Sequence, residues 1–379
     1  MKFLITTESF YPQKNGISHV VQNIVYFLKS KGHEVIIATM KLDDKSIRTR
    51  EDGVKIAEFN IKRNRFGNYV GENEKYIDFI KSCNVDVMIN ECVQTWTTDL
   101  ILPILTELNC IKILHSHGYS GLDLKPINPF MKYWFHKYYK VLHTYLKNYD
   151  HIIYLSNILE DKKYGDRYNI NHFSIIGNGV SKHFYKESYN NNILTNYNIE
   201  ENYLVSVGNF SKYKNQKFLI ESFYQVDNHS YSLVLIGNGD EYMKLMIQLK
   251  NKLDKKYGFR KVIFLSNIEV ENIATIVRFA SVFVYGSKRE AYPLVILESM
   301  SLGVPFITTN IGNVKELPGG IIVDSQKEMV KRINDLLQNK EFSIKLGKEG
   351  SEYVKHNCDW QDITQRFIDI AINIKEGKL

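Results

Sequence analysis

The sequence lacks most features that mark secreted, disulfide-bonded or membrane-spanning proteins. It has four cysteines in 379 residues, Cys83, Cys92, Cys110 and Cys358, and their spacing fits neither a disulfide framework nor a zinc site. No apolar stretch approaches the length needed to cross a bilayer. The apolar start, Met1–Thr7, is as long as a strand and too short for a signal-peptide core. We therefore expect a protein of the reducing cytoplasm, without metal or other cofactor.

Length and composition are those of a globular protein with two domains of ordinary size. Hydrophobic residues make up 44% of the chain and charged residues 24%, which is usual for globular domains. The formal net charge of +7 is moderate. It is compatible with attraction to an anionic membrane or a phosphorylated substrate, and it establishes neither.

Strand-length apolar runs alternate with helical patterns, which is typical of an α/β fold with parallel sheets. The polar, asparagine-rich segment Val180–Asn198 separates two sets of such runs and is the best linker candidate. The predicted strands are Lys2–Thr6, Glu34–Thr39, Asp86–Asn90, Ile111–His115, His151–Leu155, Tyr203–Val207, Leu233–Ile236, Val262–Leu265, Ser281–Tyr285, Pro305–Thr308 and Ile321–Val323.

The most informative stretch is Tyr285–Thr309. It predicts a polar loop holding Glu290, then a short helix that opens near Pro293, carries Glu298 and stops at Gly303. Open α/β sheets bind ligands where strands end and helices begin, so the two carboxylates could face one ligand pocket. The alternative is that both are solvated surface charges, as most carboxylates are.

This stretch resembles the E-x(7)-E signature of retaining glycosyltransferases of the GT-B fold, glycosyltransferase family 4. The register is kept at Ser287, Glu290, Pro293, Glu298, Gly303 and Pro305, and the departures are Ala291, Tyr292 and Ser299. The resemblance continues from Gly16 to Trp360. It implies two facing Rossmann-like domains with a cleft between them: an acceptor-binding domain at 1–182 and a nucleotide-sugar domain at 196–357. A C-terminal helix at 358–379 would cross back onto the first domain.

The resemblance also implies a phosphate-binding element in the second domain. Gly208 and Lys214 keep its register, but the usual arginine is Asn209. Lys214 would hold the diphosphate of the donor. Without this arginine, which can donate two hydrogen bonds, the stabilisation of the leaving diphosphate would fall by about 1.5–3 kcal/mol, the scale of a charged hydrogen bond. Either Lys212 compensates, or the chain is weak or inactive alone.

Other donor contacts follow from the same resemblance. Glu298 would bind the ribose hydroxyls, and Glu290 the sugar hydroxyls near the anomeric carbon. The helix start at Pro293, Leu294 and Val295 would face the diphosphate. Gly237, in a Gly-x-Gly after the second strand of the domain, and Asn267, beside the nucleobase, are the weaker assignments.

In the first domain, Gly16 lies at the mouth of a predicted helix, 17–29, where a ligand could reach free backbone N–H groups. The alternative is a plain turn glycine. The family has a glycine-containing loop at this place, so the resemblance implies that Gly16 contacts the diphosphate or the acceptor. His117 matches the strand-end histidine that the family places beside the transferred sugar, and His115 is the fallback. A structural histidine is the alternative. No third metal ligand is apparent near the two histidines, and zinc needs at least three.

Residues 125–149 have basic and aromatic side chains and no acidic residue before Asp150. On a helix, Lys132, His136, Lys140, His143 and Lys147 form one stripe. The predicted apolar face is Met131, Trp134, Phe135, Tyr138, Val141, Leu142 and Tyr145. Either this is a surface helix that packs on its own sheet, or it also contacts a membrane interface. No nucleic-acid-binding pattern accompanies it, so we expect no nucleic-acid partner.

Together these features imply a metal-independent retaining hexosyltransferase. No Asp-x-Asp motif occurs, which disfavours the metal-dependent route. The donor would be a nucleotide-diphosphate sugar, and a UDP-sugar is the first choice among these. The acceptor would be a glycan or polyprenyl-linked molecule of bacterial surface polysaccharide synthesis, at the inner face of the cell membrane. The alternatives are a non-catalytic GT-B subunit, motivated by Asn209, and an epimerase or phosphorylase on the same fold.

Overall fold

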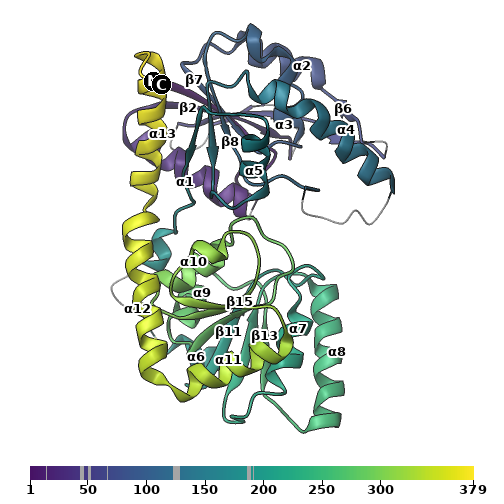
Figure 1. The fold of residues 1–379 in the computed structure, drawn as a ribbon, viewed down its shortest axis with the longest axis vertical. Coiled ribbons are helices and arrows are strands. Elements are labelled where there is room, and N and C mark those ends of the chain that lie inside the picture. The colour runs from purple at the N-terminus through teal and green to yellow at the C-terminus, as the bar shows by residue number, and fades with distance from the viewer. Residues whose placement is uncertain are drawn as a thin grey trace. The chain divides into compact units, whose positions relative to one another are not determined.

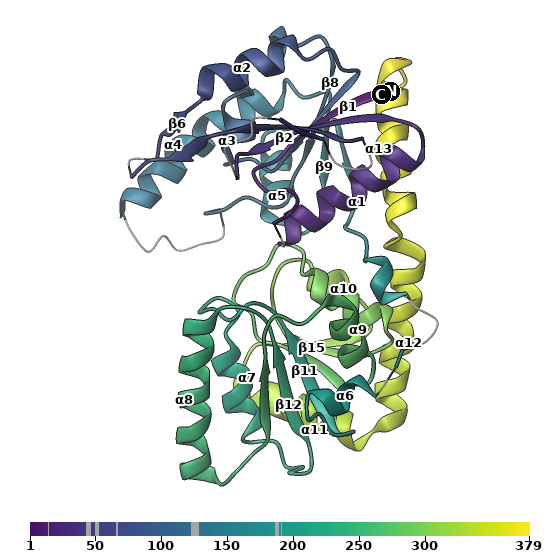
Figure 2. The same ribbon diagram turned by 180° about the vertical axis from the view of Figure 1, so that it is seen from behind.

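The computed structural model describes residues 1–13, 15–42, 47–49, 53–65, 67–122, 129–185, 189–190 and 192–379. The chain divides into two compact units, each with its strands enclosed by helices (Figures 1 and 2). The first unit is Met1–Asn178 with Trp360–Leu379, and the second is Gly179–Asp359. No helix of the described residues is long and apolar enough to cross a membrane.

The first unit is built on an eight-stranded sheet in the order β10-β9-β8-β7-β1-β2-β4-β3, parallel except for β3. Its strands are β1 (Lys2–Thr6), β2 (Glu34–Met40), β3 (Ile47–Thr49), β4 (Lys55–Phe59), β7 (Val87–Glu91), β8 (Ile111–His115), β9 (His151–Tyr154) and β10 (Phe173–Ile175). A separate hairpin, β5 (Ile61–Arg63) and β6 (Tyr69–Gly71), lies outside this sheet.

Helices cover this sheet because each buries one apolar stripe. In α1 (Gly16–Ser30) the Asn15 side chain accepts from the Ser18 N–H and so caps the helix. The last helix, α13 (Trp360–Lys375), packs against α1 and β8 (Figure 2). The others are α2 (Asn73–Ser82), α3 (Trp96–Asp99), α4 (Pro129–Leu146), α5 (Glu160–Arg167) and the 3₁₀ helix Leu102–Glu107.

The second unit has six parallel strands in the order β13-β12-β11-β14-β15-β16. They are β11 (Tyr203–Val207), β12 (Ser232–Ile236), β13 (Val262–Leu265), β14 (Val282–Tyr285), β15 (Phe306–Thr309) and β16 (Gly320–Val323). The direction of winding reverses between β11 and β14. In open α/β sheets this switch point is where ligands bind, beyond the carboxyl ends of the strands.

Helices line both faces of this second sheet. They are α6 (Ile193–Asn196), α7 (Gln216–Phe223), α8 (Asp240–Tyr257), α9 (Val270–Arg278), α10 (Leu294–Ser301), α11 (Gln326–Gln338) and α12 (Lys340–Asn357), with 3₁₀ helices at Lys182–Phe184 and Val314–Glu316. The asparagine-rich segment contributes Phe184 and Leu194 to the core of this unit, where both are buried.

The predicted α/β class with two Rossmann-like units is confirmed, and all eleven predicted strands are present within a residue or two. The predicted inner face of α4 is partly wrong. Met131 and Val141 are exposed, and the buried positions are Tyr139, Leu142 and Leu146. Val141 lies about 100° around the helix from Leu142, at the edge of the apolar stripe. Residues 125–128 of the proposed membrane segment lie outside the described residues.

Candidate functional site

Loops following β11 and β14 meet at the switch point of the second unit. Lys214, from the first loop, donates from Nζ to Oε1 of Glu290 at 2.6 Å. The same oxygen accepts from the Tyr285 hydroxyl at 2.7 Å and from the Ser287 hydroxyl at 2.9 Å. Its other oxygen, Oε2, has no donor among the described residues. Three side chains therefore fix the Glu290 carboxylate and leave one acceptor atom for a ligand.

The ion pair between Lys214 and Glu290 is in partial contact with water. The two side chains are 29% and 17% exposed, and pairs in contact with water contribute about 1 kcal/mol or less. Lys214 also donates to the Tyr285 hydroxyl at 2.8 Å. Burial and the negative charges of Glu290 and Glu298 hold the Tyr285 pKa far above its ordinary value, so the phenol stays a hydrogen-bond donor.

Glu298 lies on the second turn of α10, within electrostatic reach of Tyr285. It is partly buried, and burial raises its pKa to about 7. Its carboxylate accepts no hydrogen bond from another described residue. The helix begins after Pro293, and the first-turn N–H groups of Leu294 and Val295 have no acceptor within the helix. Together they supply backbone donors and a carboxylate that lacks a partner.

A chain of asparagines links the loops after β11, β12 and β13. The Asn238 N–H donates to Oδ1 of Asn209 at 3.3 Å, and the Asn267 N–H donates to Oδ1 of Asn238 at 2.9 Å. A Cβ on Gly237 would lie 2.2 Å from the Gly208 carbonyl oxygen, so only glycine permits this approach of two loops. Asn209 thus positions a neighbouring loop and brings no positive charge.

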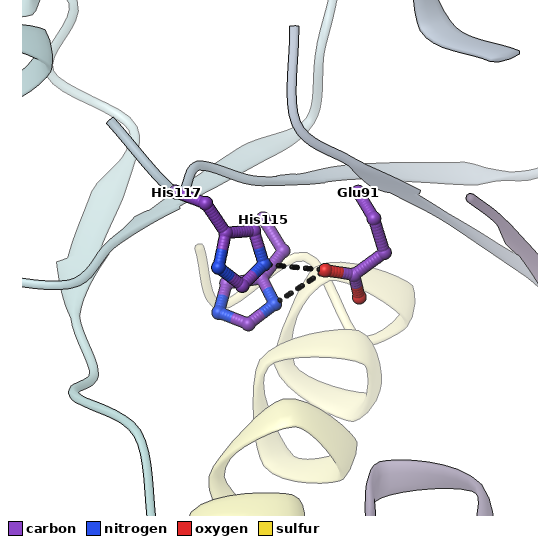
Figure 3. Close-up of side chains that lie close together, drawn as sticks. All are labelled: Glu91, His115 and His117. Carbon is purple, nitrogen blue, oxygen red and sulfur yellow. Dashed lines mark hydrogen bonds and ion pairs between the residues drawn. The ribbon is translucent and has the colours of Figure 1, made fainter. Parts of the chain in front are cut away.

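The first unit has its own cluster at the carboxyl ends of β7 and β8 (Figure 3). Glu91 ends β7 and stands opposite His115 in the parallel register. One oxygen, Oε2 of Glu91, accepts from His115 Nδ1 at 3.0 Å and from His117 Nε2 at 2.6 Å. All three side chains are almost fully buried. The other oxygen, Oε1, has no hydrogen-bond partner among the described residues.

Electrostatics fix the protonation states in this cluster. Burial opposes the Glu91 charge, but the two histidines outweigh it and lower the Glu91 pKa to about 2. Burial and the neighbouring His115 lower the His117 pKa below its ordinary value. His117 is therefore neutral near pH 7. Its Nε2 carries the proton donated to Glu91, and its Nδ1 is an acceptor.

Glu91 supplies the third ligand that sequence reasoning missed, so the expectation of only two metal-ligand side chains here is wrong. The ligand atoms of Glu91, His115 and His117 lie within 4.8 Å of one another. Two histidines and a glutamate form a donor set that zinc uses. The signal was present in the sequence, because Glu91 directly follows the predicted strand Asp86–Asn90 and parallel strands end at one edge.

The predicted site residues thus fall into two groups. One group lies on the loops and the helix at the carboxyl edge of the second sheet: Gly208, Asn209, Lys214, Gly237, Asn267, Glu290, Pro293, Leu294, Val295 and Glu298. Gly16 opens α1 in the first unit, exposed and next to the capping Asn15. The sequence pattern assigns no role to Tyr285. In the structure its hydroxyl forms hydrogen bonds with Lys214 and Glu290.

This arrangement lies within a region that matches a family model. Residues 191–353, which include every one of the second-unit site residues, match the model described as "Glycosyl transferases group 1". This part of the second unit is therefore similar to group 1 glycosyltransferases.

Curated relatives include glycosyltransferases. The chain is 27% identical over 257 residues to an uncharacterised glycosyltransferase of Methanocaldococcus jannaschii, covering 66% of this chain and 65% of that protein. It is 24% identical to N-acetyl-alpha-D-glucosaminyl L-malate synthase of Bacillus anthracis, over 47% of this chain and 48% of that protein. The matches therefore span between about half and two thirds of the relatives' lengths.

Solved structures share the GT-B fold over almost the whole chain. Sucrose-phosphate synthase from Thermosynechococcus elongatus has a TM-score of 0.80 at 16% identity and covers 99% of both chains. Anabaena HepE, solved in complex with UDP-glucose, has a TM-score of 0.75 at 15% identity and covers 99% of this chain and 100% of its own. At these identities the likeness establishes the fold.

Proposed function

We propose that this protein is a retaining hexosyltransferase that uses a UDP-sugar donor without a metal ion. The observation that carries the proposal is the network of Lys214, Tyr285, Ser287 and Glu290 at the switch point of the unit that is similar to group 1 glycosyltransferases. The UDP-glucose complex of the Anabaena neighbour and the sugar-transferring names of the relatives support the donor class.

In the proposed mechanism, Lys214 leaves Glu290 and pairs with the diphosphate of the donor. The first-turn N–H groups of α10 add donors, so negative charge that develops on the leaving phosphate is stabilised. The free Oε2 of Glu290 accepts from a sugar hydroxyl near the anomeric carbon. The Glu298 carboxylate accepts from the ribose hydroxyls, in a place where it has no protein donor.

The bond changes balance within donor and acceptor. The bond from the anomeric carbon to the phosphate oxygen breaks, and a bond to the acceptor oxygen forms on the same face. Configuration is retained because the new bond forms on the face that the phosphate leaves. The acceptor proton passes to the departing phosphate oxygen, so no further reactant is consumed. The protein binds, orients and neutralises charge, and no side chain has to form a covalent bond.

In the first unit, we assign His117 to a hydroxyl of the transferred sugar. Glu91 holds its imidazole with Nε2 protonated, which leaves Nδ1 to accept a hydroxyl proton. Gly16 would offer backbone N–H at the mouth of α1. The acceptor would be a glycan or polyprenyl-linked molecule of bacterial surface polysaccharide synthesis, met at the inner face of the cell membrane. The exposed basic residues Lys132, Lys137 and Lys140 of α4 would favour that location.

A second candidate is a non-catalytic subunit, because Asn209 stands where the family has an arginine and is engaged by Asn238. Lys212 is exposed on the same loop and could supply the missing charge. An epimerase is the third reading, and it would convert a UDP-sugar with no acceptor present.

The deciding experiment incubates the purified chain with a panel of UDP-sugars and with glycan and polyprenyl diphosphate acceptors. We expect UDP release with at least one donor and loss of that activity in Glu290→Gln. The matched control is Glu349→Gln, an exposed glutamate of α12 that pairs only loosely with Lys345 at 3.9 Å. Conversion of a donor to its epimer without acceptor, or full activity in Glu290→Gln, contradicts the proposal.

A further inference from the structure

The cluster of Glu91, His115 and His117 in the first unit has the arrangement of a metal site. One ligand atom from each of the three side chains lies within 4.8 Å of the other two. Glu91 and His115 end the neighbouring parallel strands β7 and β8 and stand opposite each other in their register. In Figure 3 both imidazole rings point a nitrogen at the same carboxylate. The backbone therefore brings the three ligand atoms to one place.

The distances within the cluster are close to those that a zinc ion requires. Ligand atoms bound to tetrahedral zinc at about 2.0–2.2 Å lie about 3.3 Å from one another. Here Oε2 of Glu91 lies 3.0 Å from Nδ1 of His115 and 2.6 Å from Nε2 of His117. The side chains would have to separate by less than about 1 Å to admit the ion. Oε1 of Glu91 is buried without a hydrogen-bond partner among the described residues, so the carboxylate has an unused oxygen as well.

A second buried carboxylate makes the surroundings of the cluster favourable for a cation. Asp161 is fully buried, and its Oδ2 accepts from the Ser116 hydroxyl and from the Gly118 N–H, the latter at 3.2 Å. It therefore lies against the loop that carries both histidines. Within the part of the chain that the structure describes, no lysine or arginine forms an ion pair with Glu91 or Asp161. Negative charge in a buried place is costly unless it is paired, and a metal ion is one such partner.

The donor set selects the ion. Two histidines and a glutamate are a set that zinc uses, with a fourth position left for water or another ligand. Magnesium and calcium prefer oxygen ligands throughout, so the two imidazoles disfavour them. Sites with such ligands also hold zinc more tightly than manganese or ferrous iron.

We propose that Glu91, His115 and His117 bind a Zn²⁺ ion and that the bound ion inhibits the transferase. Zinc on Nε2 of His117 replaces the proton that this nitrogen donates to Glu91, and the remaining ring proton lies on Nδ1. In the proposed mechanism Nδ1 accepts from a sugar hydroxyl, and in the zinc-bound state it is a donor. The ion also adds positive charge beside a sugar ring on which positive charge develops as its bond to the phosphate breaks. The inhibition rests on the proposed function, whereas zinc binding does not.

The first test measures zinc binding by the full chain, freed of metal and titrated with Zn²⁺ against a chromophoric chelator. We expect one equivalent to bind and excess Mg²⁺ not to displace it. Glu91→Gln and His115→Gln, made separately so that one poorly folded variant leaves the other to decide, should each weaken binding at least about tenfold, because loss of an outer-shell partner alone can cost that much. X-ray absorption at the zinc edge should show nitrogen and oxygen ligands at about 2.0–2.2 Å.

The matched control is His356→Gln, which removes an exposed histidine of α12 in the second unit and should leave zinc binding unchanged. Absence of zinc binding, or equal affinity of the wild type and both ligand variants, overturns the site. A sulfur ligand at about 2.3 Å does the same, because it would place the ion on a cysteine.

The second test adds one equivalent of Zn²⁺ to the donor and acceptor pair that releases UDP. We expect the rate to fall severalfold and to recover when a chelator removes the ion, while the residual activity of His115→Gln should not respond to zinc. An unchanged rate in the zinc-loaded wild type overturns the inhibition. Zinc binding by a chain that binds no UDP rejects the proposed transferase and keeps the metal site, and UDP release without zinc binding rejects only the metal site.

Discussion

Glu298 is a carboxylate whose surroundings do not compensate its negative charge. It is partly buried and has no protein donor, and burial raises its pKa to about 7. A carboxyl group with a raised pKa stabilises the fold fully below its unfolded pKa of 4.5, and that contribution is lost as the pH rises through 7.

We therefore predict that Glu298→Gln stabilises the ligand-free protein at pH 8 by about 1–3 kcal/mol and has little effect at pH 4.5. The measurement is urea denaturation at both pH values, with Glu349→Gln as the control for an exposed glutamate. Addition of UDP should offset this stabilisation at pH 8, because in the proposed site the charged carboxylate accepts from the ribose hydroxyls more strongly than the neutral amide does. An equal effect of the substitution at both pH values would reject a charged, ligand-free Glu298.

Glu91 acts through His117 and is a positioning residue in this account. In Glu91→Gln we predict a fall in kcat of about tenfold, with the KM for the donor nearly unchanged. The acid limb of the pH–rate profile should shift to lower pH, because removing the carboxylate removes a charge that favours the imidazolium. An unshifted acid limb, or a loss confined to protein stability, would leave Glu91 a structural residue only.

At the scale of elements, the contact between the loops after β11 and β12 requires Gly237. Its Cβ position is 2.2 Å from the Gly208 carbonyl oxygen, which belongs to backbone and cannot move aside cheaply. We predict that Gly237→Ala costs about 1–3 kcal/mol of unfolding free energy and weakens UDP binding as the loops separate. Denaturant unfolding and titration of UDP measure the two effects. Unchanged binding together with lost stability would remove Gly237 from the donor site.

Strands with a continuous apolar run could be predicted from the sequence. Strands that form only because they pair with a neighbouring strand could not. The central strands are continuous apolar runs and were found within a residue or two. The strands β3 to β6 and β10 were missed. β3 and β10 are the edge strands of the first sheet, β5 and β6 form the separate hairpin, and β4 lies inside the sheet but has the polar residues Lys55 and Glu58 in its apolar run. Edge and hairpin strands bury little apolar surface, so their sequences carry a weaker signal.

The same limit applies to the candidate site. Lys214 and Glu290 were selected by resemblance, but their contact joins residues 76 positions apart and depends on β11 lying beside β14. The pairing of Glu91 with His115 and His117 follows likewise from the register of β7 and β8.

For the molecule as a whole, transfer from a UDP-sugar requires that the second unit hold the diphosphate of the nucleotide through Lys214. The most direct measurement is the dissociation constant of UDP for the wild-type chain, for Lys214→Met and for Lys217→Met, an exposed lysine three residues away on α7. We predict binding that weakens at least about tenfold in Lys214→Met and is unchanged in Lys217→Met. Equal affinity of Lys214→Met and the wild type, or no binding of UDP to either, would contradict the account.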